Sequence, residues 1–333
     1  MKQQDQHSLL GFSIRNQIIS HDVFEAGFAR IEVHHQRARA SGFPHGLLIT
    51  GLSGSGKSTL RDEYLSRYPR SDEGTVSHIP ILSVDTPAAP TVKNLAETIL
   101  IALGDSASHK GSAEDKTQRI YHFLRLCKVE LLLIDEFQHF AEHGRRSEMA
   151  RVSDWLKSLI NRSGVSVVLF GLPSCELALQ CNIQLARRFS ARYNLMRFSI
   201  ETDAGMLKFR ALLKAIEGIL PLPSVALSTM EMATRFYFGS FGLIDYVGKI
   251  VDGAVQAAAR NRSSCIDMQD YGQAFVEEVW RDCPPNLNPF LGNDKLRPLI
   301  RAGEPFAMAS GAEAYNRRIS KKNHEEASLS TTA

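Results

Sequence analysis

A glycine-rich run that ends in lysine and serine has the residue types needed to hold a polyphosphate. The run Gly51-Leu-Ser-Gly-Ser-Gly56-Lys57-Ser58 fits the spacing G-x-x-x-x-G-K-[ST] of the P-loop. Its glycines let the backbone wrap around phosphate oxygens, and N–H groups at the start of the following helix point at the anion. We expect Lys57 to reach the β- and γ-phosphates of ATP and the Ser58 hydroxyl to ligate Mg²⁺. The residues expected to contact the nucleotide are Gly51, Ser53, Gly54, Ser55, Gly56, Lys57, Ser58 and Thr59.

An acid pair further along the chain supplies the second half of such a site. Asp135 and Glu136 follow the apolar run Leu131-Leu-Leu-Ile134, which predicts a buried strand with both acids at its carboxyl end. Asp135 is expected to hold Mg²⁺ through water, and Glu136 to polarise the water that attacks the γ-phosphate. The alternative is a strand that simply ends in a solvated acidic turn, and the upstream P-loop argues against it.

Two adjacent arginines, Arg187 and Arg188, lie between the fourth and fifth expected strands. An arginine at this place can project into the nucleotide site of a neighbouring subunit, where it neutralises transition-state charge and is worth roughly 10³ to 10⁵ in rate. Either arginine could have this role, with Arg192 as a weaker candidate. Two solvated arginines on a helix surface remain the alternative.

These motifs need a particular order of strands and helices around them. Apolar runs predict strands at 46–50, 78–84, 129–134, 165–170 and 195–200. Helical periodicity between the strands predicts crossover helices, as in the helix that Thr91 caps and Gly104 ends. Strands that alternate with helices indicate a P-loop α/β fold with a parallel sheet and flanking helices.

The pattern changes after the fifth expected strand. From 203 to 283 only helical periodicity is present, which predicts a small all-helical lid domain. The remaining expected divisions are an N-terminal segment and helix at 1–45, the α/β core at 46–202, and a C-terminal extension at 284–333. The extension is rich in Pro and Asn and becomes polar from Gly311, so we expect it to be partly disordered.

The composition excludes several classes of protein. The chain has 333 residues, of which 44% are hydrophobic and 23% charged, enough for one large or two ordinary globular domains. No run approaches the ~18 apolar residues of a membrane span, and the N-terminus is polar. The five cysteines lack metal-ligand spacing. We expect a cytoplasmic protein with reduced thiols and no membrane partner.

The net charge of +3 permits nucleic-acid binding without arguing for it. A solvated surface is the commoner explanation for small basic clusters, and contact with DNA phosphates is the functional one. The clusters that could contact DNA are Lys110 with Lys116 and Arg119, Arg145 with Arg146 and Arg151, and Arg260 with Arg262.

With the P-loop, the acid pair, the later arginine and the helical domain in this order, the chain resembles an AAA+ ATPase. Within that group it is similar to the TniB/TnsC transposition regulators over about residues 12–280, and its length and C-terminal extension are closest to TnsC of CRISPR-associated transposons. The finer resemblance is carried by Phe12 to Phe28, Leu47 to Thr59, the helix from Pro90 to Gly104, Leu132-Leu-Ile-Asp-Glu-Phe-Gln-His139 and Val168-Leu-Phe-Gly-Leu-Pro173.

The resemblance implies a protein that binds ATP and Mg²⁺ between subunits and assembles as a ring or helical filament around double-stranded DNA. Such proteins link a target-selecting complex with a TniQ-type adaptor to the transposase, and hydrolysis limits the assembly. The residues that carry over by motif are Lys57, Ser58, Asp135, Glu136 and Arg188.

Two features depart from the usual AAA+ pattern. The polar sensor expected after the fourth strand is not clear, and Ser174 is the nearest candidate. The lid arginine expected near Gly242-Leu-Ile-Asp245 is absent, and Lys249 is the closest basic residue. Both departures argue against fast intrinsic hydrolysis, and slow turnover would suit a timer.

Two other classes of function remain open. One is a small-molecule kinase, because similar P-loops occur in such enzymes, although a kinase does not need the water-activating Glu136. The other is an ATP-gated signalling scaffold that does not act on DNA, and assembly with ATP in the presence and absence of duplex DNA would separate it from a transposition regulator.

Overall fold

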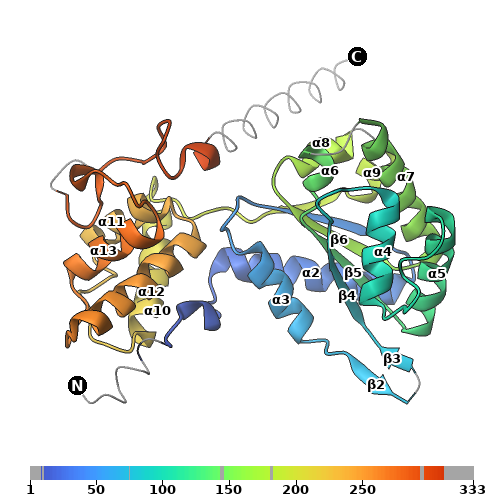
Figure 1. Cartoon of the computed structure of the whole chain (residues 1–333), viewed down its shortest axis with the longest axis horizontal. Coiled ribbons are helices and arrows are strands. Elements are labelled where there is room, and N and C mark those ends of the chain that lie inside the picture. The colour runs from blue at the N-terminus through green and yellow to red at the C-terminus, as the bar shows by residue number, and fades with distance from the viewer. Residues whose placement is uncertain are drawn as a thin grey trace. The chain divides into compact units, whose positions relative to one another are not determined.

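The computed structural model describes residues 9, 11–74, 76–142, 146–180, 183–292 and 296–310. They form two compact units (Figure 1). The sheet unit comprises Asp22–Gly51 and Gly56–Leu195. The helical unit comprises the described residues up to His21, the short segment Leu52–Ser55, and the described residues from Met196 onward. No helix among these residues is long and apolar enough to cross a membrane.

The sheet unit is built on a five-stranded sheet with the order β4-β5-β6-β1-β7. All neighbouring strands run parallel, as the alternation of strands and helices predicts. Because parallel strands need crossover connections, their carboxyl ends all lie at one edge of the sheet. The strands are β1 (Gly46–Thr50), β4 (Ile81–Asp85), β5 (Leu131–Asp135), β6 (Ser166–Gly171) and β7 (Ala191–Asn194).

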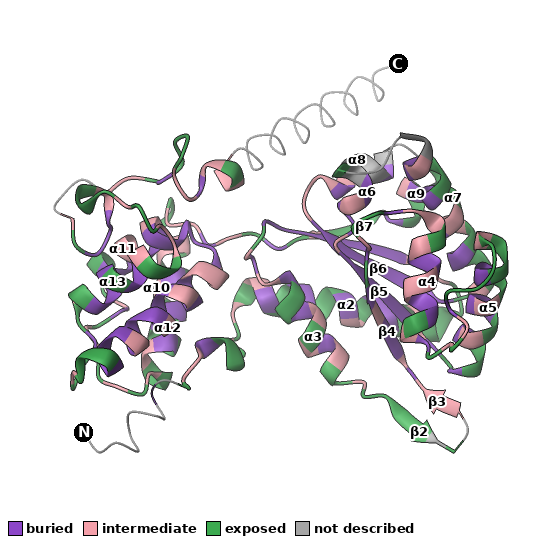
Figure 2. Ribbon diagram, viewed as in Figure 1, coloured by how far each residue is buried: buried purple, intermediate pink, exposed green. Residues whose placement is uncertain are grey.

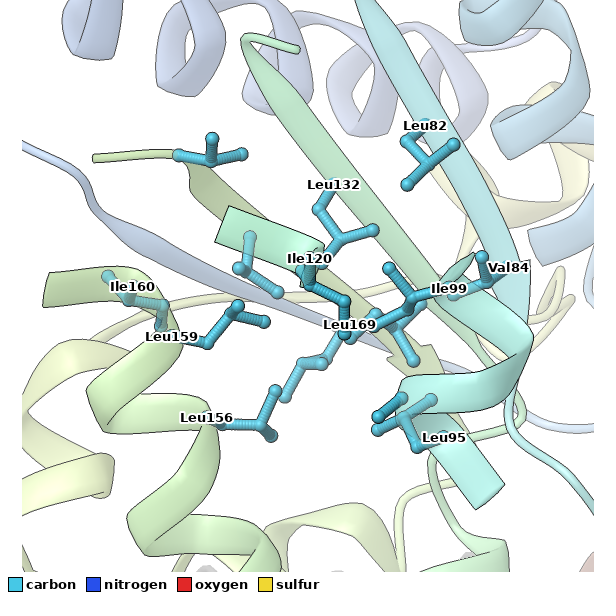
Figure 3. Packing of buried hydrophobic residues seen from close by; sticks show 14 of the residues in the cluster. Leu82, Val84, Leu95, Ile99, Ile120, Leu132, Leu156, Leu159, Ile160 and Leu169 are labelled. Atoms are coloured by element: carbon cyan, nitrogen blue, oxygen red, sulfur yellow. The ribbon is translucent and has the colours of Figure 1, made fainter. Parts of the chain in front are cut away.

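Both faces of this sheet are covered, so each inner strand contributes to two apolar clusters. In β5, Ile134 and Leu132, which is labelled in Figure 3, lie in one cluster, while Leu131 and Leu133 lie in the other. Burial of each such side chain stabilises the fold by about 1.5–3 kcal/mol, and burial on two faces explains why the strands are continuous apolar runs. The helices on the first face are α4 (Val92–Ala102), α5 (Ala113–Leu126) and α7 (Arg146–Ser163), and those on the second are α2 (Asp22–Ser41) and α3 (Lys57–Ser66).

Local capping begins the helices at the places that their sequences indicate. Thr91 accepts a hydrogen bond from the Asn94 N–H at the start of α4, and Gly104 follows its end with φ of 85°. Ser112 and Asp115 form a reciprocal capping box at the start of α5. The predicted limits of the α4 helix are therefore confirmed.

Two predicted strands differ from the structure. The run 78–84 is divided at Pro80 into β3 (Val76–His78) and β4, and β3 pairs in antiparallel fashion with β2 (Ser71–Glu73) in a hairpin that is not buried (Figure 2). Pro80 has no N–H for the ladder, and its carbonyl instead accepts from the Glu130 and Leu131 N–H groups at 2.9 and 3.2 Å.

The fifth strand is also displaced from its predicted position. It is β7, Ala191–Asn194, and not 195–200. This strand lies at the sheet edge with mostly exposed side chains, so it has no apolar run to reveal it. The connection before it contains the short helices α8 (Cys175–Gln180) and α9 (Ile183–Arg188), and α6 (His139–Glu142) follows β5.

The helical unit confirms the predicted helical region. Thr202, Thr229 and Asp267 accept backbone hydrogen bonds as N-caps of three of its helices. Gly253 lies against Ala274, and small residues on α12 allow a close approach to α13. The helices are α10 (Asp203–Ile219), α11 (Met230–Ser240), α12 (Ile244–Asn261) and α13 (Met268–Glu278).

The expected divisions at 45 and 283 do not coincide with the borders of the two units. The N-terminal segment belongs to the helical unit, because Asp252 of α12 accepts hydrogen bonds from the Ser13 hydroxyl and the Ile14 N–H at 2.8 and 2.7 Å. The residues after α13 belong to it as well, since Phe290, Leu299 and Phe306 are buried in its core. The residues from 311 onward, which were expected to be disordered, lie outside the described residues.

We expect Phe290→Ala to destabilise the helical unit by about 3–5 kcal/mol, the usual cost of removing a buried phenylalanine ring. The Phe290 ring lies 5.1 Å from Phe236 and 5.7 Å from Tyr271 between centroids. Urea unfolding followed by circular dichroism measures the loss. The control is Met308→Ala, whose side chain is 89% exposed and which should leave the midpoint unchanged. An unaltered midpoint for the Phe290 variant would exclude this segment from the core.

Candidate functional site

The P-loop follows β1 directly, and α3 begins within it at Lys57. Gly54 and Gly56 have φ of 79° and 94°, a left-handed backbone that side-chain-bearing residues rarely adopt. The loop closes on itself through a hydrogen bond of 3.1 Å from the Ser55 N–H to the Leu52 carbonyl. The predicted order of strand, loop and helix is thus confirmed. Gly54 and Gly56 occupy the positions of the loop that need a left-handed backbone.

Lys57 is buried and points back along its own loop. The residue is only 8% exposed, and its Nζ donates a hydrogen bond to the Gly51 carbonyl at 2.9 Å. Burial lowers the pKa of the Lys57 ammonium, although the charges of Asp135 and Glu136 act in the opposite direction. A buried cation at a loop of backbone N–H groups is an arrangement that binds a polyanion such as a triphosphate.

Asp135 ends β5 with its carboxylate almost fully buried. Oδ1 accepts the Glu136 N–H at 2.7 Å, and Oδ2 accepts from Arg61 Nη1 at 2.8 Å. Burial raises the pKa of Asp135, against the effect of these two hydrogen-bonding partners. The sequence did not point to Arg61, because no local pattern marks this position of the helix as a contact of Asp135.

Glu136 has a backbone that is unusual for its residue type. Its φ is 55°, in the left-handed region, where a residue with a Cβ is strained. Its side chain is 43% exposed, and Oε2 lies 3.8 Å from His139 Nε2. A carboxylate that is partly open to solvent beside a buried Asp135 can accept a proton from a water molecule.

Gln138 contacts Glu136 and was not among the residues that the sequence indicated. Its side-chain amide donates to Glu136 Oε2, and its Oε1 accepts the Leu172 N–H at 3.0 Å. The residue is 5% exposed, so these bonds are shielded from water. Gln138 therefore connects Glu136 to the end of β6, where a polar sensor was expected, whereas Ser174 contacts Glu142 at 3.4 Å. Gln138 lies in the run Asp135 to His139, which indicated the resemblance to the TniB/TnsC regulators but gave no role for this glutamine.

The donor groups around the P-loop and the β5 tip fit a magnesium-bound nucleotide. Ser55 Oγ in the loop and Thr86 Oγ1 at the end of β4 are buried without a hydrogen-bond partner among the described residues. Thr86 lies beside the acid pair, because its N–H donates to the Asp135 carbonyl at 2.9 Å. Hydroxyl and carboxylate oxygens are the ligands that Mg²⁺ prefers, so Ser58 and Asp135 are suitable holders of the ion.

The arginines after β6 lie on the surface of the sheet unit. Arg187 and Arg188 are exposed in the last turn of α9. Arg192 on β7 is instead paired with Glu176 at 3.3 Å. An open depression of about 480 Å³ is lined by Ile183, Ala186, Arg187, Ser190 and Arg192.

The candidate DNA contacts have different surroundings. Lys116 was expected on the surface, but it is fully buried, paired with Glu97 at 2.7 Å and hydrogen-bonded to the Ser108 carbonyl, so it does not face solvent. Its place on an amphipathic helix did not reveal this, because the charge is compensated by a partner on α4. Arg119 binds the carbonyls of the loop before α5.

The other basic residues of these clusters keep their expected exposure where the structure describes them. Lys110 is exposed, and the Arg151 side chain is 72% exposed although it pairs with Glu148. Arg260 is paired with Glu277, and Arg262 is exposed at the end of α12. Arg145 lies outside the described residues, and nothing is described of the Arg146 side chain.

Within the helical unit, the loop segment Leu52–Ser55 lies at the start of α12. The Asp245 N–H donates to the Gly54 carbonyl at 3.1 Å, and Leu52 is buried in the core of this unit. Arg15 of the N-terminal segment pairs with Asp245 at 3.3 Å, close in sequence to the place where a lid arginine was expected. Lys249 pairs with the same carboxylate at 2.8 Å.

The parallel sheet with flanking helices and the helical region after it have the fold of P-loop AAA+ proteins. Similar solved structures include the ORC1 protein of Aeropyrum pernix in complex with DNA, at 15% identity and a TM-score of 0.58, with 81% of this chain and 69% of that chain covered. Cdc6p of Pyrobaculum aerophilum matches at 13% identity and a TM-score of 0.58, with 81% and 70% covered. The Aeropyrum pernix ORC2 protein in ADPNP–ADP complexes matches at 13% identity and a TM-score of 0.57, with 77% and 68% covered.

The amino-acid sequence shows the family to which the chain belongs. The family described as "Bacterial TniB protein" matches residues 12–199, which include the P-loop, the acid pair and Arg188. The chain belongs to this TniB family. Among curated proteins, none matches it.

We expect Gln138→Met to lower ATP hydrolysis about 10- to 100-fold with little change in ATP affinity, as for other residues that orient a reacting group. Methionine keeps the volume and removes both hydrogen bonds to Glu136 and Leu172. Phosphate release and fluorescent-nucleotide binding measure the two quantities. The matched control is Gln36→Met on the exposed side of α2. Equal losses of affinity and rate would show that Gln138 only supports the fold.

Proposed function

We propose that this protein is an ATP-dependent AAA+ regulator of DNA transposition that assembles on double-stranded DNA, of the TnsC type that occurs in CRISPR-associated transposons. The observation that carries the proposal is the buried Lys57 on the P-loop together with the Asp135–Glu136 pair, in a chain of the TniB family. A water-activating carboxylate beside the metal-holding one favours a nucleotide hydrolase over a kinase.

Each residue at the site has a chemical part in hydrolysis. Lys57 binds the β- and γ-phosphates, while Ser58 and Asp135 hold Mg²⁺, which supplies positive charge to the phosphate oxygens when it is bound. Glu136 accepts the proton of the attacking water, and Gln138 keeps the Glu136 carboxylate oriented. The strained backbone at Glu136 supports a functional role, because such conformations cluster at active sites.

The site is completed in this proposal by a second copy of the chain. Arg188 is exposed at the end of α9, where it is available to a neighbouring subunit. A nucleotide that needs Arg188 from the next copy binds the assembled state more tightly, so ATP favours a ring or filament. Hydrolysis then weakens the contact and limits the assembly.

Binding to the DNA backbone would organise that assembly. The exposed Lys110 and Arg151 are suitable for phosphate contacts, which are tolerant of sequence and weakened by salt. The similarity to an ORC1 protein solved in complex with DNA supports this part of the proposal. A TniQ-type target-selection adaptor and the transposase subunits are the partners that membership of the TniB family suggests.

We expect Lys57→Ala to abolish ATP-dependent assembly, because the loop loses the cation that binds the phosphates. Gel filtration with ATP, with and without duplex DNA, is the measurement. Lys93→Ala, which removes an exposed lysine from α4, is the matched control and should assemble normally. Assembly of the Lys57 variant like the wild type would contradict the nucleotide site. Assembly of the wild type with ATP that ignores DNA would favour a signalling scaffold.

We expect Arg188→Ala to retain ATP binding but to lose about 10³-fold or more in hydrolysis, the effect of removing an arginine finger. Mixing this variant with Lys57→Ala should restore part of the activity, because one mixed interface has an intact P-loop and an intact arginine. Arg187→Ala is the neighbouring control. If the mixture stays inactive although the two variants are found together in one assembly, Arg188 does not act on the adjacent subunit.

A further inference from the structure

A single guanidinium connects two carboxylates at the carboxyl edge of the sheet. Asp85 and Asp135 end the neighbouring strands β4 and β5 and are paired in register. Arg61, one turn into α3, places Nη1 at 2.7 Å from Asp85 Oδ1 and at 2.8 Å from Asp135 Oδ2. Its Nε lies 2.9 Å from Asp62 on the same helix.

The charges at this edge are unequally exposed. The Asp135 side chain is 3% exposed and that of Arg61 is 16% exposed, whereas Asp85 and Asp62 are 69% and 60% exposed. A buried carboxylate without a compensating cation is strongly disfavoured. Arg61 is the cation that is hydrogen-bonded to Asp135 and compensates its charge.

The two oxygens of Asp135 leave little freedom for another ligand. Oδ1 accepts the N–H of the next residue, Glu136, and this bond is fixed by the backbone. Oδ2 accepts from Arg61, which is on a side chain and can move. A magnesium ion or its bound water that approaches Oδ2 therefore competes with the Arg61 guanidinium.

We propose that Arg61 holds the place of the divalent cation in the nucleotide-free protein and gives up Asp135 when magnesium-bound nucleotide arrives. Asp85 and Asp62 retain the guanidinium after it leaves Asp135, so neither state has an uncompensated buried charge. Arg61 then sets how much Mg²⁺ the site needs, and nucleotide without the metal does not release Asp135. This inference rests on the proposed nucleotide site.

The opposite role for Arg61 makes a different prediction. If Arg61 orients Asp135 for the metal, its removal should raise the Mg²⁺ requirement. If it competes with the metal, its removal should lower that requirement by about tenfold, which corresponds to 1.4 kcal/mol.

The first test uses Arg61→Gln in the full chain and Mn²⁺ alone as the probe, without nucleotide. The electron paramagnetic resonance signal of free Mn²⁺ should fall at concentrations about tenfold lower than for the wild type, because the pair of carboxylates is no longer neutralised. Arg67→Gln is the matched control, since this arginine follows α3, lies over the Phe28 ring and, among the described acids, pairs with Glu63 rather than with Asp85 or Asp135. Unchanged or weaker Mn²⁺ binding by the Arg61 variant would overturn the proposal.

The second test measures binding of a fluorescent ATP analogue as Mg²⁺ is varied. Arg61→Gln should reach half-saturation at about tenfold less Mg²⁺, and Asp85→Asn should need several-fold more, because the displaced guanidinium loses its second holder. A higher requirement for the first variant, or a lower or unchanged one for the second, contradicts the competition. The Asp85 variant keeps the test decisive if Arg61→Gln does not fold. Absence of nucleotide binding by the wild type would reject the proposed function, while the Mn²⁺ comparison would still decide the role of Arg61.

Discussion

Backbone pairing between parallel strands is the constraint on which the candidate site depends. β6 pairs with both β1 and β5, so the strand that enters the P-loop and the strand that ends in Asp135 are held at fixed register on either side of it. The next pairing places Asp85 level with Asp135. Since these strands are buried on both faces, a slip of one residue would turn every apolar side chain to the wrong cluster. The same packing that stabilises the sheet therefore positions the chemistry at its edge.

Charge compensation in a dry environment is the second requirement. Lys57, Asp135 and Arg61 are all substantially buried at the carboxyl edge, where an unpaired charge is costly. Each of these charges has a partner. Arg61 donates a hydrogen bond to Asp135, and Lys57 donates one to the Gly51 carbonyl of its own loop. A triphosphate and its metal bring charges of both signs, so their arrival exchanges partners without leaving any of these groups alone.

The sequence predicted the parts of the fold that have a strong local signal. The P-loop, the run before Asp135 and the caps of α4 are patterns in which neighbouring residues determine the conformation. The edge strand β7 was misplaced because its side chains face solvent and the nearby Leu195 and Phe198 are buried for other reasons. Lys116 was misread because its partner Glu97 is on another helix, and no local pattern reports such a contact.

The candidate site divides in the same way. The residues with a motif, such as Lys57 and Glu136, were identified from the sequence, and their roles remain predictions. Arg61 and Gln138 were missed because their importance comes from the tertiary contacts that they make, with Asp85 and Asp135 in one case and with Leu172 in the other.

The left-handed backbone at Glu136 has a consequence for how such a protein can change over evolutionary time. At φ of 55°, glycine and asparagine are more comfortable than glutamate. Replacement by either would relieve the backbone strain, but it would also remove the carboxylate that accepts the hydrogen bond of the buried Gln138 amide. Under the proposed function, the same single change would leave a protein that binds nucleotide without turning it over.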